Sequence, residues 1–304
     1  MFQIRFTKLL FKLEMLENGV LPYYKVSAIR GGMGQMLLLQ NCIGDRECGK
    51  CSFYEKCVVQ NIMYAPCKIK PPYMASSESM GYVIDCLDHR TSCNKGDIIT
   101  VTFTFFGDAI CYIMPVVYAL TSLGCAGLGK DKTRFCIKAI NNRKQVPVLI
   151  NNNIQMSNVF VELLGDYVNE MVNQNSKLCT KVKILLQSPC AVKYQGGFIH
   201  SFDGHSVVLS ILQKLHMYNM YEGNEIEKVI WDEEKFPVVA GQSLQEKIIQ
   251  RYSSTQDTKM KLKGVQGEIL LENCCKEARE LLYAAEILHI GKNTRFGFGK
   301  IKIT

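Results

Sequence analysis

The sequence lacks a cleavable apolar segment at its start. Arg5 and Lys8 lie within residues 1–8, whereas a secretory signal needs an uninterrupted apolar region followed by a cleavage site. The 14 cysteines are therefore expected to be thiols of a cytoplasmic protein and not the disulfide framework of a secreted one.

Long uncharged stretches are scarce as well. Residues 109–129 form the longest uncharged run, which is about long enough to cross a bilayer. Pro115 and several polar side chains interrupt this run, and segments with strand periodicity flank it closely. The run therefore predicts a helix buried in a protein core, and the sequence predicts no membrane partner.

Acidic residues are missing from residues 291–304, which hold glycines at 291, 297 and 299 beside Lys292 and Arg295. Glycine has no Cβ, so this backbone can turn sharply or touch a ligand closely, and cations beside bare amides suit a phosphate. A tight turn without a ligand is the alternative. The net charge of +8, from 36 basic and 28 acidic side chains, also suggests a polyanionic partner.

A related segment occurs near the middle of the chain. Residues 127–140 and 291–302 share Gly-Lys, one or two polar residues, Thr-Arg-Phe and a tail of alternating basic and apolar residues. Lys130 and Arg134 of the first copy are therefore further candidates to bind phosphate. A separation of roughly half the chain suits one domain used twice.

The order of predicted elements indicates which domain is repeated. From Phe2 to Ile140 the pattern predicts strand, helix, strand, strand, helix and strand, the split βαβ order of a ferredoxin-like domain. The second half repeats this order less clearly. We therefore predict an α+β protein of tandem ferredoxin-like domains, residues 1–145 and 155–304. The first would carry a cysteine-rich insertion at 41–72 and the second the glycine-rich loop.

That insertion holds four closely spaced cysteines, namely Cys42, Cys48, Cys51 and Cys57. Four thiolates at this spacing match a tetrahedral structural zinc site, in which the metal replaces a core that so short a segment cannot build. Free thiols and an iron–sulfur cluster are the alternatives. Because protein would fill all four positions, a metal here would be structural, and no cofactor is expected to take part in catalysis.

Other cationic residues fall in patterns that suit RNA. Arg30 precedes a glycine-rich helix start, whose amides can hold an anion, and a plain loop is the alternative. Lysines recur at alternate positions on two predicted strands, so each row would share one face that an RNA backbone could follow. Solvated edge lysines are the alternative for each row. The rows are Lys181 with Lys183, and Lys259 with Lys261 and Lys263.

Together these features resemble a known family. The chain is similar to the CRISPR-associated endoribonucleases of the RAMP superfamily that process precursor CRISPR RNA, in a variant with a four-cysteine insertion in the first domain. The resemblance spans nearly the whole chain, and its most specific part is the motif at residues 288–299. The other matching segments are Ile29-Arg30-Gly31, the cysteine quartet, residues 70–73, residues 105–107 and Ser188-Pro189.

The resemblance implies both partners and a reaction. Two ferredoxin-like domains would hold CRISPR repeat RNA across the cleft between them, and other CRISPR-associated proteins could bind as well. The family cuts without metal: the ribose 2′-hydroxyl attacks the adjacent phosphorus and leaves a 2′,3′-cyclic phosphate and a 5′-hydroxyl. This reaction needs a base, an acid and cations at the phosphate.

The catalytic residues are harder to assign because the chain departs from the family pattern. Many members carry a catalytic histidine near the first helix, but this chain has no histidine before His89. His289, beside the glycine-rich loop, is the favoured acid or base, assisted by a tyrosine at 23 or 24. A buried structural role for His289 remains open. The alternative catalytic set has no histidine and consists of Tyr23, Tyr24, Lys25 and Arg30.

A non-catalytic RNA-binding RAMP subunit of a CRISPR effector complex is the alternative function, since the same fold can serve as a scaffold on guide RNA. The missing early histidine favours this alternative. Both functions need RNA contacts. The residues expected to make them are Arg30, Lys130, Arg134, Lys181, Lys183, Lys261, Lys263, Gly291, Lys292, Arg295, Gly297 and Gly299.

Overall fold

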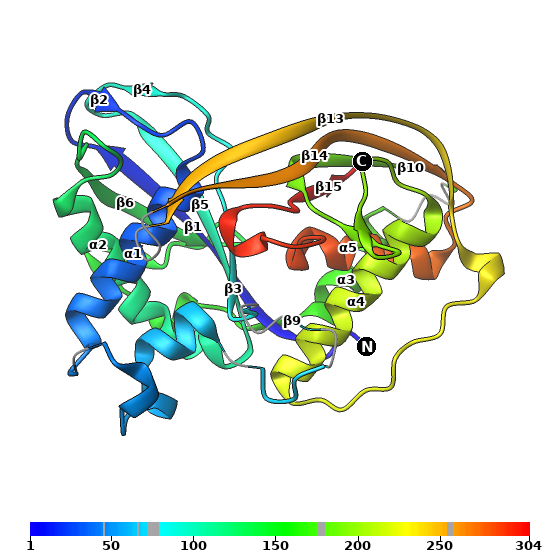
Figure 1. The fold of residues 1–304 in the computed structure, drawn as a ribbon, viewed down its shortest axis with the longest axis horizontal. Helices are drawn as coiled ribbons and strands as arrows, with labels where there is room; N and C mark the ends of the chain where they lie inside the picture. The colour runs from blue at the N-terminus through cyan, green and yellow to red at the C-terminus, as the bar shows by residue number, and fades with distance from the viewer. Residues whose placement is uncertain (45, 66, 72–73, 75–78, 176–179, 254–257) are drawn as a thin grey trace.

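The structure is a computed structural model that describes the chain except residues 45, 66, 72–73, 75–78, 176–179 and 254–257, and for 251–253 and 258–259 it describes the backbone alone. Pro72 and Tyr73 of the resemblance therefore lie outside the described residues. Two halves lie side by side, and a long two-stranded ribbon crosses from one to the other (Figure 1).

The first half is an antiparallel sheet with two helices. Its main strands are β1 (Arg5–Met15), β3 (Tyr82–Asp85), β5 (Ile98–Phe106) and β6 (Phe135–Asn142), in the order β3-β5-β1-β6. The helices are α1 (Lys25–Asn41) and α2 (Ile113–Ala126). Leu9, Phe11 and Leu13 alternate along β1 and are buried, as the two-residue period of a strand requires. They share one core with Ile29 and Met33 of α1.

The uncharged run forms α2 and most of the preceding 3-10 turn η4 (Gly107–Tyr112). Val116, Leu120 and Leu123 recur at helical spacing and are buried in the first core. By length and composition alone, Gly107–Ala126 is the one helix in the described part of the chain that could cross a membrane. Its packing agrees with the expected core helix.

The second half repeats the sheet with a longer hairpin. Its main strands are β10 (Val182–Cys190), β13 (Val238–Ser253), β14 (Thr258–Glu272) and β15 (Ile301–Ile303), in the order β13-β14-β10-β15. The helices are α3 (Leu164–Gln174), α4 (Gly204–Glu222) and α5 (Lys276–Leu288). At the start of α4 the Asp203 carboxylate accepts a hydrogen bond from the Ser206 amide at 2.7 Å, which closes a capping box.

Short elements complete the chain. The strands are β2 (Gly19–Val20), β4 (Ser92–Cys93), β7 (Leu149–Ile150), β8 (Asn153–Ile154), β9 (Glu162–Leu163), β11 (Lys193–Tyr194) and β12 (Gly197–Phe198). The helical turns are η1 (Cys48–Lys50), η2 (Tyr54–Lys56), η3 (Gln60–Tyr64), η5 (Met156–Asn158), η6 (Glu233–Lys235) and η7 (Thr294–Phe296).

Both sheets have the same topology. If the main strands are counted along each half, they lie in the spatial order second, third, first, fourth in the first sheet, and the second sheet repeats that order. In both halves a helix follows the first strand and another follows the third. This is the split βαβ arrangement, so the predicted α+β fold of tandem ferredoxin-like units is confirmed.

The halves share elements. Ile4 and Phe6 pack in the core of the second half, whereas Leu9 and the rest of β1 pack in the first. The short strand β9, which follows residue 155, pairs with β1. The ribbon consists of β13 and β14, and Ile249 of β13 and Leu262 of β14 pack against the core of the first half. These contacts fix the geometry of the space between the halves.

Candidate active site

The two halves meet at a cavity of about 570 Å³, which we call the interdomain cavity. Tyr23, Tyr24 and His89 line it from the first half, and residues of β10, β13 and β14 line it from the second. Sites for ligands occur preferentially at such domain interfaces. A histidine and two phenol rings make this cavity the candidate active site.

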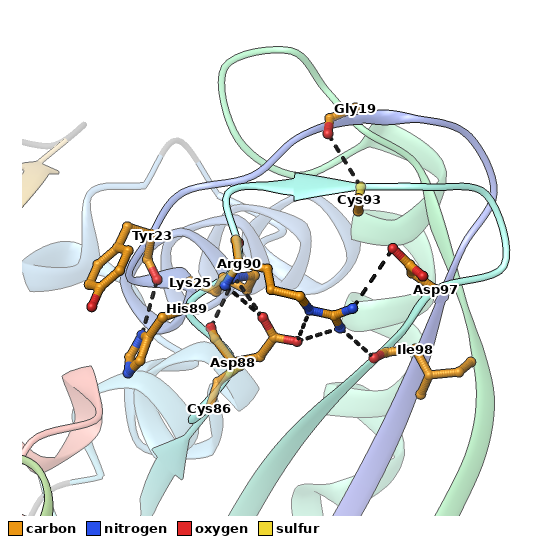
Figure 2. A network of polar contacts seen from close by, with 10 residues as sticks. All are labelled: Gly19, Tyr23, Lys25, Cys86, Asp88, His89, Arg90, Cys93, Asp97 and Ile98. Atoms are coloured by element: carbon orange, nitrogen blue, oxygen red, sulfur yellow. Dashed lines mark hydrogen bonds and ion pairs between the residues drawn. The ribbon is translucent and has the colours of Figure 1, made fainter.

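His89 stacks on Tyr23. The ring centroids are 4.8 Å apart and the planes are 17° apart, and the Tyr24 ring is nearly parallel to the same imidazole at 6.1 Å. Nδ1 of His89 lies 3.3 Å from the backbone carbonyl of Tyr23 (Figure 2). Because a carbonyl only accepts, Nδ1 carries the hydrogen of this contact, and Nε2 has no hydrogen-bond partner among the described residues. Nε2 is therefore available to exchange a proton with a ligand.

Lys25 fixes the loop that carries His89 (Figure 2). Its Nζ donates to the carbonyls of Asp88 at 2.9 Å and Arg90 at 2.6 Å, and lies 3.3 Å from the Asp88 carboxylate. Arg90 in turn donates to that carboxylate at 2.6 Å. Lys25 is 1% exposed. The structure therefore buries this predicted catalytic residue outside the lining of the interdomain cavity, where it positions residues 88–90.

Tyr24 connects the cavity to the glycine-rich loop. Its hydroxyl is buried and has no hydrogen-bond partner among the described residues. A Cβ built on Gly297 would lie 2.9 Å from this hydroxyl. Burial raises the pKa of Tyr24 well above its usual value. The phenol therefore stays protonated and can donate a hydrogen bond, but it is unsuited to act as a base.

The first turns of α1 carry two further unpartnered donors. Ser27 Oγ and Arg30 Nε are buried and lack partners among the described residues, as does the Tyr24 hydroxyl. Residues spaced three apart lie along one side of a helix, and α1 packs against η7 of the glycine-rich loop. Arg30 also lies over the ring of Phe296 in η7, 4.5 Å from its centroid. Donors of this kind suit a phosphate, and of these three residues Tyr24 lines the interdomain cavity.

The glycine-rich loop joins α5 to β15. Gly291, Gly297 and Gly299 all have positive φ, which favours glycine. A Cβ on Gly299 would lie 2.0 Å from the Ile290 carbonyl. Contacts within the protein thus already require these glycines. The loop is tethered to the rest of the protein: the Lys292 backbone amide donates to the Ala191 carbonyl at 2.8 Å, and the Arg295 guanidinium donates to the Met63 carbonyl at 3.3 Å.

His289 lies in the core and does not line the interdomain cavity. It is 1% exposed, with Nδ1 3.2 Å from the Phe298 carbonyl and Nε2 3.7 Å from Asp85 Oδ2. Burial lowers the pKa of His289 to about 4, because the effect of burial outweighs that of the nearby carboxylate. A neutral, buried imidazole fits the structural role that the sequence left open.

Several predicted RNA-binding cations form ion pairs with glutamate carboxylates. Arg134 pairs with Glu17 at 2.9 Å, and Lys181 pairs with Glu272 at 2.7 Å. Lys183 pairs with Glu268 across the β10–β14 ladder. Lys130 is exposed. None of these four lines the interdomain cavity.

Lys261 and Lys263 lie on the other face of the ribbon. They are exposed and line a second cavity, of about 470 Å³, with Phe198, His200 and Asn293. The Phe198 ring is 57% exposed, so an aromatic surface adjoins two cations beside the glycine-rich loop. Lys259 lies in the part of β14 whose side chains are not described.

Sequence reasoning did not assign a role to His89. The ion pair and stacking that position it join residues 23–25 to residues 88–90, and no local spacing indicates such contacts. The available signal was its place just after a predicted strand, where loops often carry functional residues.

Comparison with known proteins identifies the family. Residues 184–301 match the family model described as CRISPR-associated endoribonuclease Cas6, and residues 4–159 match AF_1859_N, described as an N-terminal domain. The second half of this chain therefore carries a Cas6 domain. The expected RAMP-type assignment is thereby confirmed, although these matches do not address its four-cysteine insertion. No curated protein matches this chain.

Solved Cas6 structures share the fold. Thermus thermophilus Cas6 matches with a TM-score of 0.54 and 11% identity, over 99% of each chain. A Cas6 product complex matches with a TM-score of 0.55 and 15% identity, over 98% of this chain and 99% of that one. A partial Cas6-RT-Cas1–Cas2 complex matches with a TM-score of 0.63 and 10% identity. This chain is covered to 99% in that match but spans 46% of the other chain.

The buried position of His289 predicts a pH dependence of stability. The pKa of His289 is about 4 in the folded protein, whereas a histidine in the unfolded chain has the ordinary value of 6.5. As the pH falls, the unfolded chain therefore binds the proton first. The neutral buried imidazole contributes on the order of 3 kcal/mol to the free energy of unfolding above pH 6.5, and this contribution is lost as the pH falls toward 4. Urea unfolding across this range should give a flatter profile for His289→Gln than for wild type. His200→Gln, at an exposed position, is the control, and equal slopes for His289→Gln and wild type would contradict the assignment.

Proposed function

We propose that this protein is a metal-independent endoribonuclease that cleaves CRISPR repeat RNA, with His89 as its acid–base residue. The observation that carries the proposal is that His89 lines the interdomain cavity while its Nε2 has no hydrogen-bond partner among the described residues. The protein would act in the cytoplasm, and no membrane takes part.

His89 is suited to remove the proton of a ribose 2′-hydroxyl. With Nδ1 donating to the Tyr23 carbonyl, the lone pair of the neutral imidazole is on Nε2. The 2′-oxygen would attack the adjacent phosphorus as its proton passes to Nε2, and the bond from phosphorus to the 5′-oxygen would break. The products are a 2′,3′-cyclic phosphate and a 5′-oxygen that takes a proton to become a hydroxyl.

The first turns of α1 would hold the reacting phosphate. The Tyr24 hydroxyl, Ser27 Oγ and Arg30 Nε are buried donors without protein partners among the described residues. Donors of this kind, fixed before the RNA binds, stabilise the negative charge that grows on the phosphate oxygens. Lys25 would act as a positioning residue, because its contacts hold the loop of His89.

The flanking RNA would lie along the face of the ribbon that carries Lys261 and Lys263. Lys261 and Lys263 could contact phosphates, and the exposed Phe198 ring could stack on a base. Other CRISPR-associated proteins are proposed partners. A chain that matches this fold belongs to a complex named with Cas1 and Cas2, but the present chain spans less than half of it.

Substitution of His89 tests the proposal. In EDTA, wild-type protein should cut its own repeat RNA, and His89→Ala should slow cutting by roughly 100-fold or more with little loss of binding, because a general acid or base is removed. His205→Ala, which removes a partly exposed histidine outside the cavity, is the matched control. A deoxyribose 5′ of the scissile phosphate should abolish cutting. Bound but uncut RNA with wild-type protein would support the scaffold function instead.

The proposed RNA path predicts a change in salt dependence. Lys261→Ala combined with Lys263→Ala should weaken binding and reduce the slope of log affinity against log salt by about one for each phosphate that a removed lysine neutralises. Lys138→Ala removes an exposed lysine of the first half that pairs with Glu14 and serves as the control. An unchanged slope in the double variant would exclude RNA from this face.

A further inference from the structure

The cysteine quartet is a motif that the proposed function does not use. We infer that Cys42, Cys48, Cys51 and Cys57 bind one structural zinc ion, which orders the segment between α1 and β3. None of the four lines the interdomain cavity, so this inference does not depend on RNA cleavage.

All four cysteines lie around one hollow. They line a single hollow of about 320 Å³ at the end of α1. Cys42 caps α1, Cys51 caps η1 and Cys57 caps η2, while Cys48 is the first residue of η1. The Cys51 amide donates to the Cys48 carbonyl at 3.3 Å. This hydrogen bond closes the Cys-x2-Cys step into the tight turn that suits two ligands of one zinc ion.

The same segment has no apolar core of its own. Neither η1 nor η2 contains a buried residue, and Ile43 and Phe53 are 76% and 56% exposed. The ion pair between Lys50 and Glu47 is local and exposed, and such pairs add little stability. A short segment without apolar burial is typically ordered by a metal or by disulfides. The four thiols here are free.

The chemistry of the donor set favours zinc. Four thiolates are soft ligands and would close a tetrahedral site completely. Two net negative charges would remain, and Arg46, which lines the same hollow, would offset part of them. Among the described residues no three His, Cys, Asp or Glu groups lie close enough together, as they are placed, to hold a metal. Zinc binding would therefore draw the thiols inward and couple ligation to local folding.

Metal analysis of the full chain, purified without added zinc, tests this inference. Wild type should contain about one zinc per chain, and Cys48→Ser combined with Cys51→Ser should lower the zinc content at least tenfold and lower the melting temperature. The control combines Cys111→Ser with Cys125→Ser, at two exposed cysteines outside the quartet, and should retain zinc. Wild type that stays zinc-free after incubation with zinc, or that holds iron instead, would overturn the inference.

If the Cys48→Ser, Cys51→Ser variant fails to fold, a second measurement on wild-type protein tests the inference. Cobalt(II) added to chelator-treated wild-type protein should give the intense visible absorption of a tetrahedral tetrathiolate site, and zinc should remove it. Absence of that spectrum would count against the quartet as ligands. Neither experiment uses RNA, so its failure would leave the cleavage assay and the proposed function untouched.

Discussion

A buried charge cluster between the two halves is the interaction on which the candidate site depends. Asp85, the last residue of β3, accepts a hydrogen bond from Lys300 Nζ at 3.2 Å, with side-chain exposures of 8% and 11%. Lys8 belongs to the same cluster, and its pKa is lowered to about 8 by burial and by the charge of Lys300. Removing one partner of such a pair costs roughly 3–5 kcal/mol, because the other charge is left uncompensated.

The cluster aligns the two sides of the interdomain cavity. Asp85 lies just before residues 88–90, so the position of β3 sets the position of His89, and Lys25 adds a second anchor from α1. Lys300 follows the glycine-rich loop directly, so the same ion pair sets the distance between that loop and His89. The charges that join the halves are buried. His89 and Tyr23, which would act on a ligand, remain accessible.

Much of the fold follows from the sequence, because local periodicity determines it. The alternation of Leu9, Phe11 and Leu13 predicts β1, and the uncharged run predicts α2. The repeated order of elements predicts two units of one topology. The ribbon was not predicted at its full length, because residues 222–258 are polar and show no clear period. The strand β13 is determined by its pairing with β14 and by the contacts of the ribbon with the first half.

The site was less predictable, because its residues meet through contacts between distant parts of the chain. A histidine or a lysine beside glycines or tyrosines suggests catalysis, yet His289 faces Asp85 in the core and Lys25 faces the loop of Asp88. Burial, which local sequence does not report, separates these structural residues from His89. The zinc expectation remains a prediction for the same reason, since spacing alone does not show whether the thiols converge.

The most direct test of the central claim is a structure of this protein with its repeat RNA carrying deoxyribose at the cut position. We expect the scissile phosphate to lie in the interdomain cavity, at the first turn of α1, with the 2′-carbon facing Nε2 of His89. RNA bound on another face, or His289 released from the core to reach the scissile phosphate, would contradict it.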